Sequence, residues 1–315
     1  TWIVGLSAQG QELFRIPVPG RGHAAAAHPQ RAEAVGFARR PGNFAVVVDC
    51  RSGQELARLK TPAGGHFYGH GAFTDDGQIL LTTENAYDVP EGRIGLWDAA
   101  AGYRRIGDLP SGGLGPHEII RLGGGGFAVA NGGIQTHPDF ARQKLNIPQM
   151  RTNLTYLAPD GQIAEVVEPP EDLRQNSIRH IAADRSGQVA IATQWQGAPT
   201  RAVPLVATHR RGGQIAFCPH PDMARLRHYA GSIAIAPDGR RLAVTGPKGD
   251  AVLLFECAAV AAAGRLDLPV AAGVAPVGAG FVVTRQGGLT WIAADGGATA
   301  APASDLTWDN HLVSV

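Results

Sequence analysis

The chain has 315 residues, a formal net charge of +1 and 44% hydrophobic residues. This near-neutral charge argues against a surface for nucleic acid or anionic membrane, which would need an excess of Lys and Arg. Glycine (42 residues) and proline (22 residues) are abundant, and Val, Ile, Thr and Ala occur in short bursts. Such a composition is typical of many short strands joined by tight turns. The length allows either two domains or one repeat architecture.

The cysteines and the N-terminus say little about compartment. Cys50, Cys218 and Cys257 are far apart and form no CxxC pair, so they predict neither a zinc knuckle nor a disulfide framework. No apolar stretch approaches the length of a membrane span. The chain begins abruptly within an apparent strand at residues 1–4, from which we expect a leader, with or without a further strand, to precede it.

Turn clusters recur at a short, regular spacing along the chain. Each stands between two apolar bursts, as a hairpin turn does. Grouping the bursts in fours gives units close to the length of a propeller blade, about 40 to 45 residues. Six such units follow one another, at residues 23–59, 70–109, 117–167, 178–217, 232–255 and 273–300.

The two ends of the chain are left over from these units. They hold predicted strands at residues 2–6, 12–18 and 311–315. We therefore predict an all-β fold, a seven-bladed β-propeller formed by residues 1–315 as a single domain. Its ring is closed by the N-terminal outer strands and the C-terminal inner strand, which leaves no open sheet edge. The alternative is two consecutive β-sandwich domains, but no linker separates two halves of this chain.

Five histidines stand at or near the predicted starts of inner strands. A single histidine at a strand end is more often a structural residue than a ligand. Recurrence in five of seven equivalent positions instead favours a shared role, because inner strands surround the central channel and should bring these side chains together at one mouth. The five residues are His23, His70, His117, His180 and His311.

Imidazoles without cysteine suit copper or iron, with nickel and zinc as further candidates, and do not suit calcium or magnesium. We therefore predict that the five inner-strand histidines form a transition-metal site. Three or four of these histidines would bind one ion. His66, His137 and His228 are expected on the same face as additional or gating ligands. Glu118 and Asp309 adjoin ligand histidines and are candidate outer partners, although rim carboxylates are more often simply solvated.

A long loop at residues 132–150 interrupts the third blade. Loops of this length in a compact repeat are usually functional. The loop carries His137, Arg142 and Lys144. It is expected either to form a lid with a basic tip over the channel mouth or only to pack against the second and fourth blades.

Five dispersed segments carry a resemblance that spans nearly the whole chain: GHAAAAHP (22–29), GHGAF (69–73), GPHE (115–118), NGGIQTHP (131–138) and WDNH (308–311). They resemble a family of uncharacterised bacterial propeller proteins exported with a twin-arginine leader. The genes of that family lie beside those for imelysin-like proteins and a di-haem oxidoreductase, in iron-uptake loci. The resemblance implies a periplasmic location and a role in metal handling. The architecture is also similar to that of nitrous oxide reductase, a propeller with a histidine-lined copper site.

Three functional hypotheses remain from the sequence. The protein is a periplasmic metal-binding protein that serves metal uptake, a metal-dependent enzyme, or an interaction scaffold with incidental histidines. An enzyme would be an oxidoreductase rather than a lactonase-like hydrolase, because lactonase-type propellers cage calcium with carboxylates and amides. The sequence shows no Ser-His-Asp order, phosphate loop or paired-carboxylate spacing.

Overall fold

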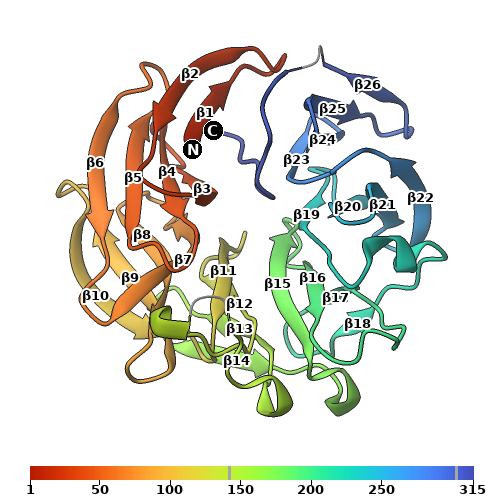
Figure 1. The fold of residues 1–315 in the computed structure, drawn as a ribbon, viewed down its shortest axis with the longest axis horizontal. Coiled ribbons are helices and arrows are strands. Elements are labelled where there is room, and N and C mark those ends of the chain that lie inside the picture. The colour runs from red at the N-terminus through yellow and green to blue at the C-terminus, as the bar shows by residue number, and fades with distance from the viewer. Residues whose placement is uncertain (141–142, 302–303) are drawn as a thin grey trace. The chain divides into compact units, whose positions relative to one another are not determined.

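The computed structural model describes residues 1–140, 143–301 and 304–315 as an all-β propeller. Six four-stranded sheets and one two-stranded sheet account for its strands, and within each sheet the strands follow chain order, as in propeller blades (Figure 1). Helical residues in these ranges form only short 3-10 turns, and no helix among them is long and apolar enough to cross a membrane. The chain divides into two compact units of three blades each.

The first unit contains Thr1–Arg121, Gly125–Val166 and Val313–Val315. Its two-stranded sheet pairs β1 (Trp2–Leu6) with β2 (Glu12–Pro17). Its three blades contain, in order, β3 (Gly22–Ala27), β4 (Glu33–Ala38), β5 (Phe44–Asp49), β6 (Glu55–Lys60); β7 (Gly65–Phe73), β8 (Ile79–Ala86), β9 (Glu91–Asp98), β10 (Arg104–Pro110); β11 (Pro116–Arg121), β12 (Phe127–Asn131), β13 (Asn153–Leu157) and β14 (Ile163–Val167).

The second unit contains Leu122–Gly124 and Val167–Leu312. Its blades contain β15 (Asn176–Ala183), β16 (Val189–Trp195), β17 (Val206–His209), β18 (Ala216–Phe217); β19 (Ser232–Ile235), β20 (Arg241–Gly246), β21 (Ala251–Glu256), β22 (Ala261–Asp267); β23 (Val274–Val277), β24 (Gly280–Arg285), β25 (Gly288–Ile292) and β26 (Ala298–Ala300). The six blades predicted from the sequence are therefore confirmed.

The predicted turn clusters lie between consecutive strands of one blade. Each has a glycine with positive φ, a conformation that glycine adopts without a steric penalty. These glycines are Gly53, Gly77, Gly161, Gly187, Gly239 and Gly296. The turn chemistry thus marks hairpins in all six blades.

The prediction of seven complete blades is not matched by the structure, which shows six four-stranded blades and the β1–β2 pair. The missing part is the C-terminal strand expected at residues 311–315, where no strand is formed. At its start this segment lies against the backbone that precedes β23: a Cβ on Gly273 would lie 2.7 Å from the carbonyl carbon of His311. The sequence pattern identified an extended segment, but extended backbone becomes a strand only where its hydrogen bonds pair with a neighbour.

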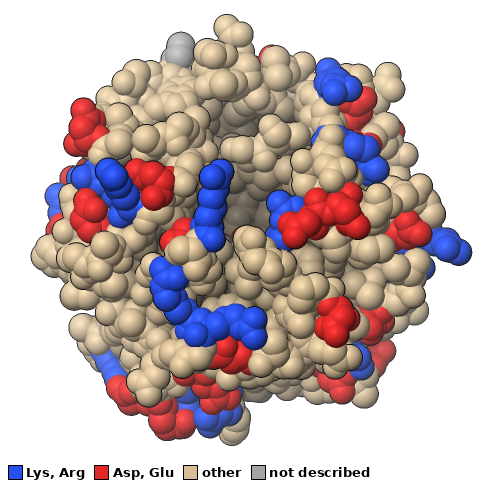
Figure 2. Space-filling model, turned by 180° about the vertical axis from the view of Figure 1, so that it is seen from behind, with Lys and Arg blue, Asp and Glu red and all other residues tan. Residues whose placement is uncertain are grey.

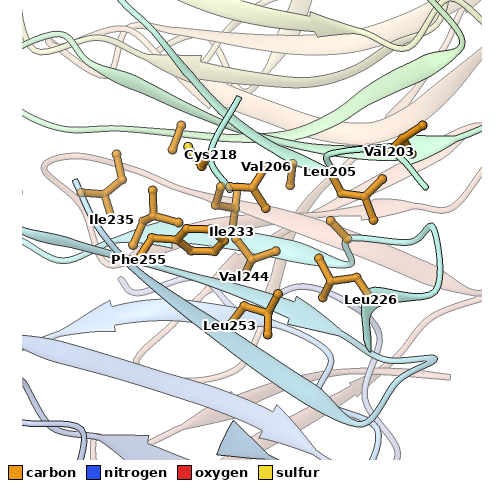
Figure 3. Packing of buried hydrophobic residues seen from close by; sticks show 14 of the residues in the cluster. Val203, Leu205, Val206, Cys218, Leu226, Ile233, Ile235, Val244, Leu253 and Phe255 are labelled. Carbon is orange, nitrogen blue, oxygen red and sulfur yellow. The ribbon is translucent and has the colours of Figure 1, made fainter. Parts of the chain in front are cut away.

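Each unit has its own apolar core between blades. In the second unit, Phe255 and Leu253 of β21 pack with Val244 of β20, Ile233 of β19 and Val206 of β17 (Figure 3). Burying each of these side chains contributes about 1.5–3 kcal/mol. In the first unit, Phe37, Phe67 and Trp97 belong to one buried cluster that spans the first two blades. These cores fix the inner strands on which the histidines stand.

Candidate metal centre

The inner strands that carry histidines are irregular at the histidine. In each of them the pairing with the next strand shifts register, which marks a β-bulge. The shifts fall between Gly22 and Ala25 in β3, Phe67 and Gly71 in β7, Pro116 and Glu118 in β11, and Ile178 and His180 in β15. The described pairs of β19–β20 and β23–β24, whose inner strands carry no histidine, show no shift. Bulges change the direction in which side chains point, and they are frequent beside active sites.

Three of the predicted ligands, His23, His70 and His117, come together in the first unit. Their ring centroids are 5.0 Å apart for His23–His70, 5.3 Å for His23–His117 and 5.1 Å for His70–His117. One nitrogen from each ring lies within 4.8 Å of one from each other ring. Nitrogens on one tetrahedral ion would be about 3.4 Å apart, so modest side-chain rotations would close the rings on a metal.

The environment of this histidine triad (His23, His70 and His117) suits a transition metal. His70 and His117 are buried, and His23 is half-buried, so the three rings lie largely away from bulk solvent. The hydroxyl of Thr83 donates to the carbonyl oxygen of His70 at 3.2 Å and so holds the ligand's backbone. A donor set of imidazoles fits copper, iron or zinc and does not fit calcium or magnesium.

Gly69 makes room for the triad. Its φ is +110°, and a Cβ at this position would lie 2.6 Å from Cδ2 of His23. A side chain at residue 69 would therefore strain the backbone and push the His23 ring away from its neighbours. The Gly-His pair is visible in the sequence, but the steric demand on the glycine depends on His23 of another blade.

We predict that Gly69→Ala lowers the affinity for a transition metal by about 10- to 100-fold, as expected when a metal ligand loses its orientation. Titration with Zn²⁺ against a chromophoric chelator measures the change. Gly102→Ala is the matched control, because Gly102 also has a positive φ (+67°) but has no atom within 4 Å of its Cβ position. Equal affinities in the two variants would contradict the steric role of Gly69.

His180 and His311 come together in the second unit, with ring centroids 4.8 Å apart. Their positions are not equivalent to those of the triad. In β15 the register shift falls at Arg179, whereas in β11 it falls at His117. His180 therefore corresponds to Glu118 in the pairing, and His311 lies outside any strand. That all five histidines share one ion stays a prediction.

His66 is held by other groups. Its Nδ1 donates to the carbonyl oxygen of Phe67 at 2.9 Å, and Asn85 Nδ2 donates to its Nε2 at 3.2 Å. The ring is nearly parallel to that of Tyr87, with centroids 6.0 Å apart. Burial lowers the pKa of His66 to about 4, so the ring is neutral at pH 7. These contacts indicate a structural histidine.

The other predicted contributors also have local partners. His137 accepts a hydrogen bond from the backbone N–H of Asp139 at 3.2 Å, and His228 Nε2 donates to the carbonyl oxygen of Arg201 at 2.9 Å. Asp309 accepts from the backbone N–H of Asn310 at 2.8 Å. Glu118 contacts the triad: its Oε1 lies 3.2 Å from Nδ1 of His70. Arg142 lies outside the described residues.

The third-blade loop is fixed internally and against the second blade. Asn146 accepts from the backbone N–H of Gln135 at 2.7 Å and donates to the carbonyl oxygen of Gly133 at 2.9 Å. Asn85 of β8 donates to the carbonyl oxygen of Thr136 at 3.2 Å. The His137 ring lies edge-on to Tyr87, with centroids 5.0 Å apart. These contacts give the packing against the second blade; packing against the fourth blade and a lid function stay predictions.

Surface charges form small mixed groups. Figure 2 shows Lys and Arg side chains beside Asp and Glu on the face it presents. In the second unit, Arg265 pairs with Asp222 at 2.6 Å and Arg225 pairs with Asp267 at 3.1 Å. Paired charges of this kind offer little attraction to a polyanion.

The fold and the site define the chain as an all-β propeller with clustered histidines on its inner strands. Residues 16–315 match the model of the family described as "Protein of unknown function (DUF1513)". The chain belongs to that family. No curated protein matches it.

Among solved structures, the chain is similar to hydrazine synthase from Kuenenia stuttgartiensis. The likeness has a TM-score of 0.68 and 13% sequence identity, and it covers 93% of this chain and 87% of that one. At this identity the likeness supports the propeller fold alone.

Proposed function

We propose that this protein binds a transition-metal ion, copper or iron, through His23, His70 and His117. The observation that carries the proposal is the meeting of three imidazoles from three successive inner strands, each at a register shift. A bulge leaves a residue unpaired in the ladder, so its repetition at each of these histidines favours function over chance. Within the second unit we propose His180 and His311 as further metal ligands, supported by their 4.8 Å ring separation.

The proposed cellular role is periplasmic metal handling, with iron uptake or redox handling as its purpose. This part rests on the resemblance carried by the segments around His23, His70, His117 and His311. Imelysin-like proteins and a di-haem oxidoreductase would be its partners. Copper and iron both have two accessible oxidation states, so the same site could hold an ion for delivery or change its oxidation state.

A metal-dependent oxidoreductase is the second candidate. The three-histidine set favours it, because three protein ligands leave a fourth coordination position for a substrate, and His23 is half-buried rather than buried. Reduction of the metal-loaded protein with dithionite, followed by electron paramagnetic resonance, distinguishes a redox-active ion from a carried one.

Metal titration tests the proposal. Untagged, metal-free protein is titrated separately with Cu²⁺, Fe²⁺ and Zn²⁺, and bound metal is counted by elemental analysis after gel filtration. We expect about one tightly bound equivalent. No retained metal with any of the three ions would overturn the proposal.

We also propose that β1, β2 and the C-terminal residues form the seventh blade. Val313–Val315 belong to the same compact unit as β1 and β2, and Ile16 of β2 packs with Val46 and Val48 of the first blade. Deleting residues 313–315 should lower the melting temperature of the metal-free protein, by about 2–4 °C for each kcal/mol lost. The single substitution Val315→Ala is the control, since this side chain is 68% exposed. An unchanged melting temperature in the deletion would contradict the seventh blade.

A further inference from the structure

We propose that Glu118 is a positioning residue that fixes the tautomer of His70, so that His70 offers Nε2 to the metal. The inference rests on the proposed metal site and concerns the contact between Glu118 and His70 within it. Glu118 Oε1 lies 3.2 Å from His70 Nδ1, and the two side chains are 17% and 4% exposed. A carboxylate at this distance accepts the Nδ1 proton, which leaves the lone pair on Nε2.

The bulge in β11 explains how neighbouring residues serve one site. In a regular strand His117 and Glu118 would point to opposite faces of the sheet. Here Pro116 pairs with Asn131 and Glu118 pairs with Ala130, so β11 advances by two residues where β12 advances by one, and His117 lies at this shift. The local bend lets the chain present His117 to the triad while Glu118 reaches His70 on β7. One strand thus supplies both a ligand and the partner of another ligand.

The chemistry of this contact favours metal binding in two ways. Hydrogen bonding to a carboxylate fixes the orientation of the ring and raises the basicity of the nitrogen that binds the metal. The carboxylate also places a negative charge near a cation that three neutral imidazoles leave uncompensated. Residues with this role change metal affinity by about 10- to 100-fold when they are removed.

The test compares Glu118→Ala, Glu118→Gln and the control Glu55→Ala. Glu55 is a carboxylate of β6 whose partner is Arg58 at 2.6 Å. Zn²⁺ is the probe, because it is diamagnetic and has no redox chemistry. Affinity is measured by competition with a chromophoric chelator, and long-range ¹H–¹⁵N spectra of ¹⁵N-histidine-labelled protein report the tautomer of His70.

We expect Glu118→Ala to bind Zn²⁺ about 10- to 100-fold more weakly than the wild type, and the His70 spectrum to lose its single Nδ1–H form. Glu118→Gln keeps an acceptor oxygen and should restore the tautomer but only part of the affinity. Glu55→Ala should match the wild type. Unchanged affinity in Glu118→Ala, or wild-type His70 bound through Nδ1, would overturn the inference.

The spectra of metal-free protein separate this inference from the metal site itself. Wild-type protein that binds no Zn²⁺ but shows the Nδ1–H form of His70, lost in Glu118→Ala, would refute the proposed function and keep the contact. Metal binding with the same His70 tautomer in both proteins would refute the positioning role alone.

Discussion

Replacing His70 and His117 with alanine should reduce bound transition metal from about one equivalent to background. The two residues are the buried members of the triad, and their rings are 5.1 Å apart. Of the triad only His23 would remain, and one of three imidazoles is too few to retain an ion through gel filtration. Elemental analysis after exposure to excess metal and gel filtration gives the count directly.

Two controls keep this result interpretable. The variant His70→Gln/His117→Gln retains more side-chain volume than the alanine pair, so it limits cavity effects while still removing the imidazoles. His209→Ala removes a buried histidine whose Nε2 is 3.2 Å from the carbonyl oxygen of Gly213 in its own hairpin, and it should keep full metal content. Full occupancy in the folded glutamine variant would show that the triad is not the metal site.

The stability of the metal-free protein should depend on pH through His66. Burial lowers the pKa of this histidine from 6.5 to about 4. The unfolded chain therefore binds a proton below pH 6.5 that the native protein does not bind until about pH 4. The neutral, buried His66 ring therefore makes its full contribution to the free energy of unfolding above pH 6.5. This contribution is lost as the pH falls from 6.5 to 4. A shift of this size corresponds to about 3 kcal/mol.

Urea unfolding of wild type and His66→Gln at several pH values measures this contribution. Glutamine keeps an acceptor for Asn85 but does not titrate in this range. The difference between the two unfolding free energies should grow by about 3 kcal/mol between pH 4 and pH 6.5 and then level off. A pH-independent difference would show that His66 is not buried as a neutral ring.

The sequence predicted the hairpins well because their chemistry is local. A cluster such as Asp75-Asp76-Gly77 needs only a short side chain and a glycine with positive φ, here +70°. Asp76 Oδ1 accepts from the backbone N–H of Gln78 at 3.0 Å, a bond made within the turn itself. Such signals depend on few neighbours, and they recur in all six blades.

The geometry of the site depends on pairing between strands and could not be predicted in detail. The register shift falls at His117 itself in β11, but in β15 it falls at Arg179, one residue before His180. A one-residue difference in register is invisible in a single sequence and changes which side chain faces the site. Likewise His66 and His70 both lie on β7, and contacts that the sequence does not reveal, such as the bond from Asn85 to His66, distinguish the surroundings of the two rings.

X-ray absorption of the metal-loaded protein tests the central claim most directly. The account predicts a first shell that contains at least three nitrogens at about 2.0–2.1 Å for zinc, with the outer scattering pattern of imidazole rings. The Glu118→Ala protein should keep the same nitrogen ligands at lower occupancy. A first shell of oxygen atoms without imidazole scattering would contradict the assignment of His23, His70 and His117 as the metal site.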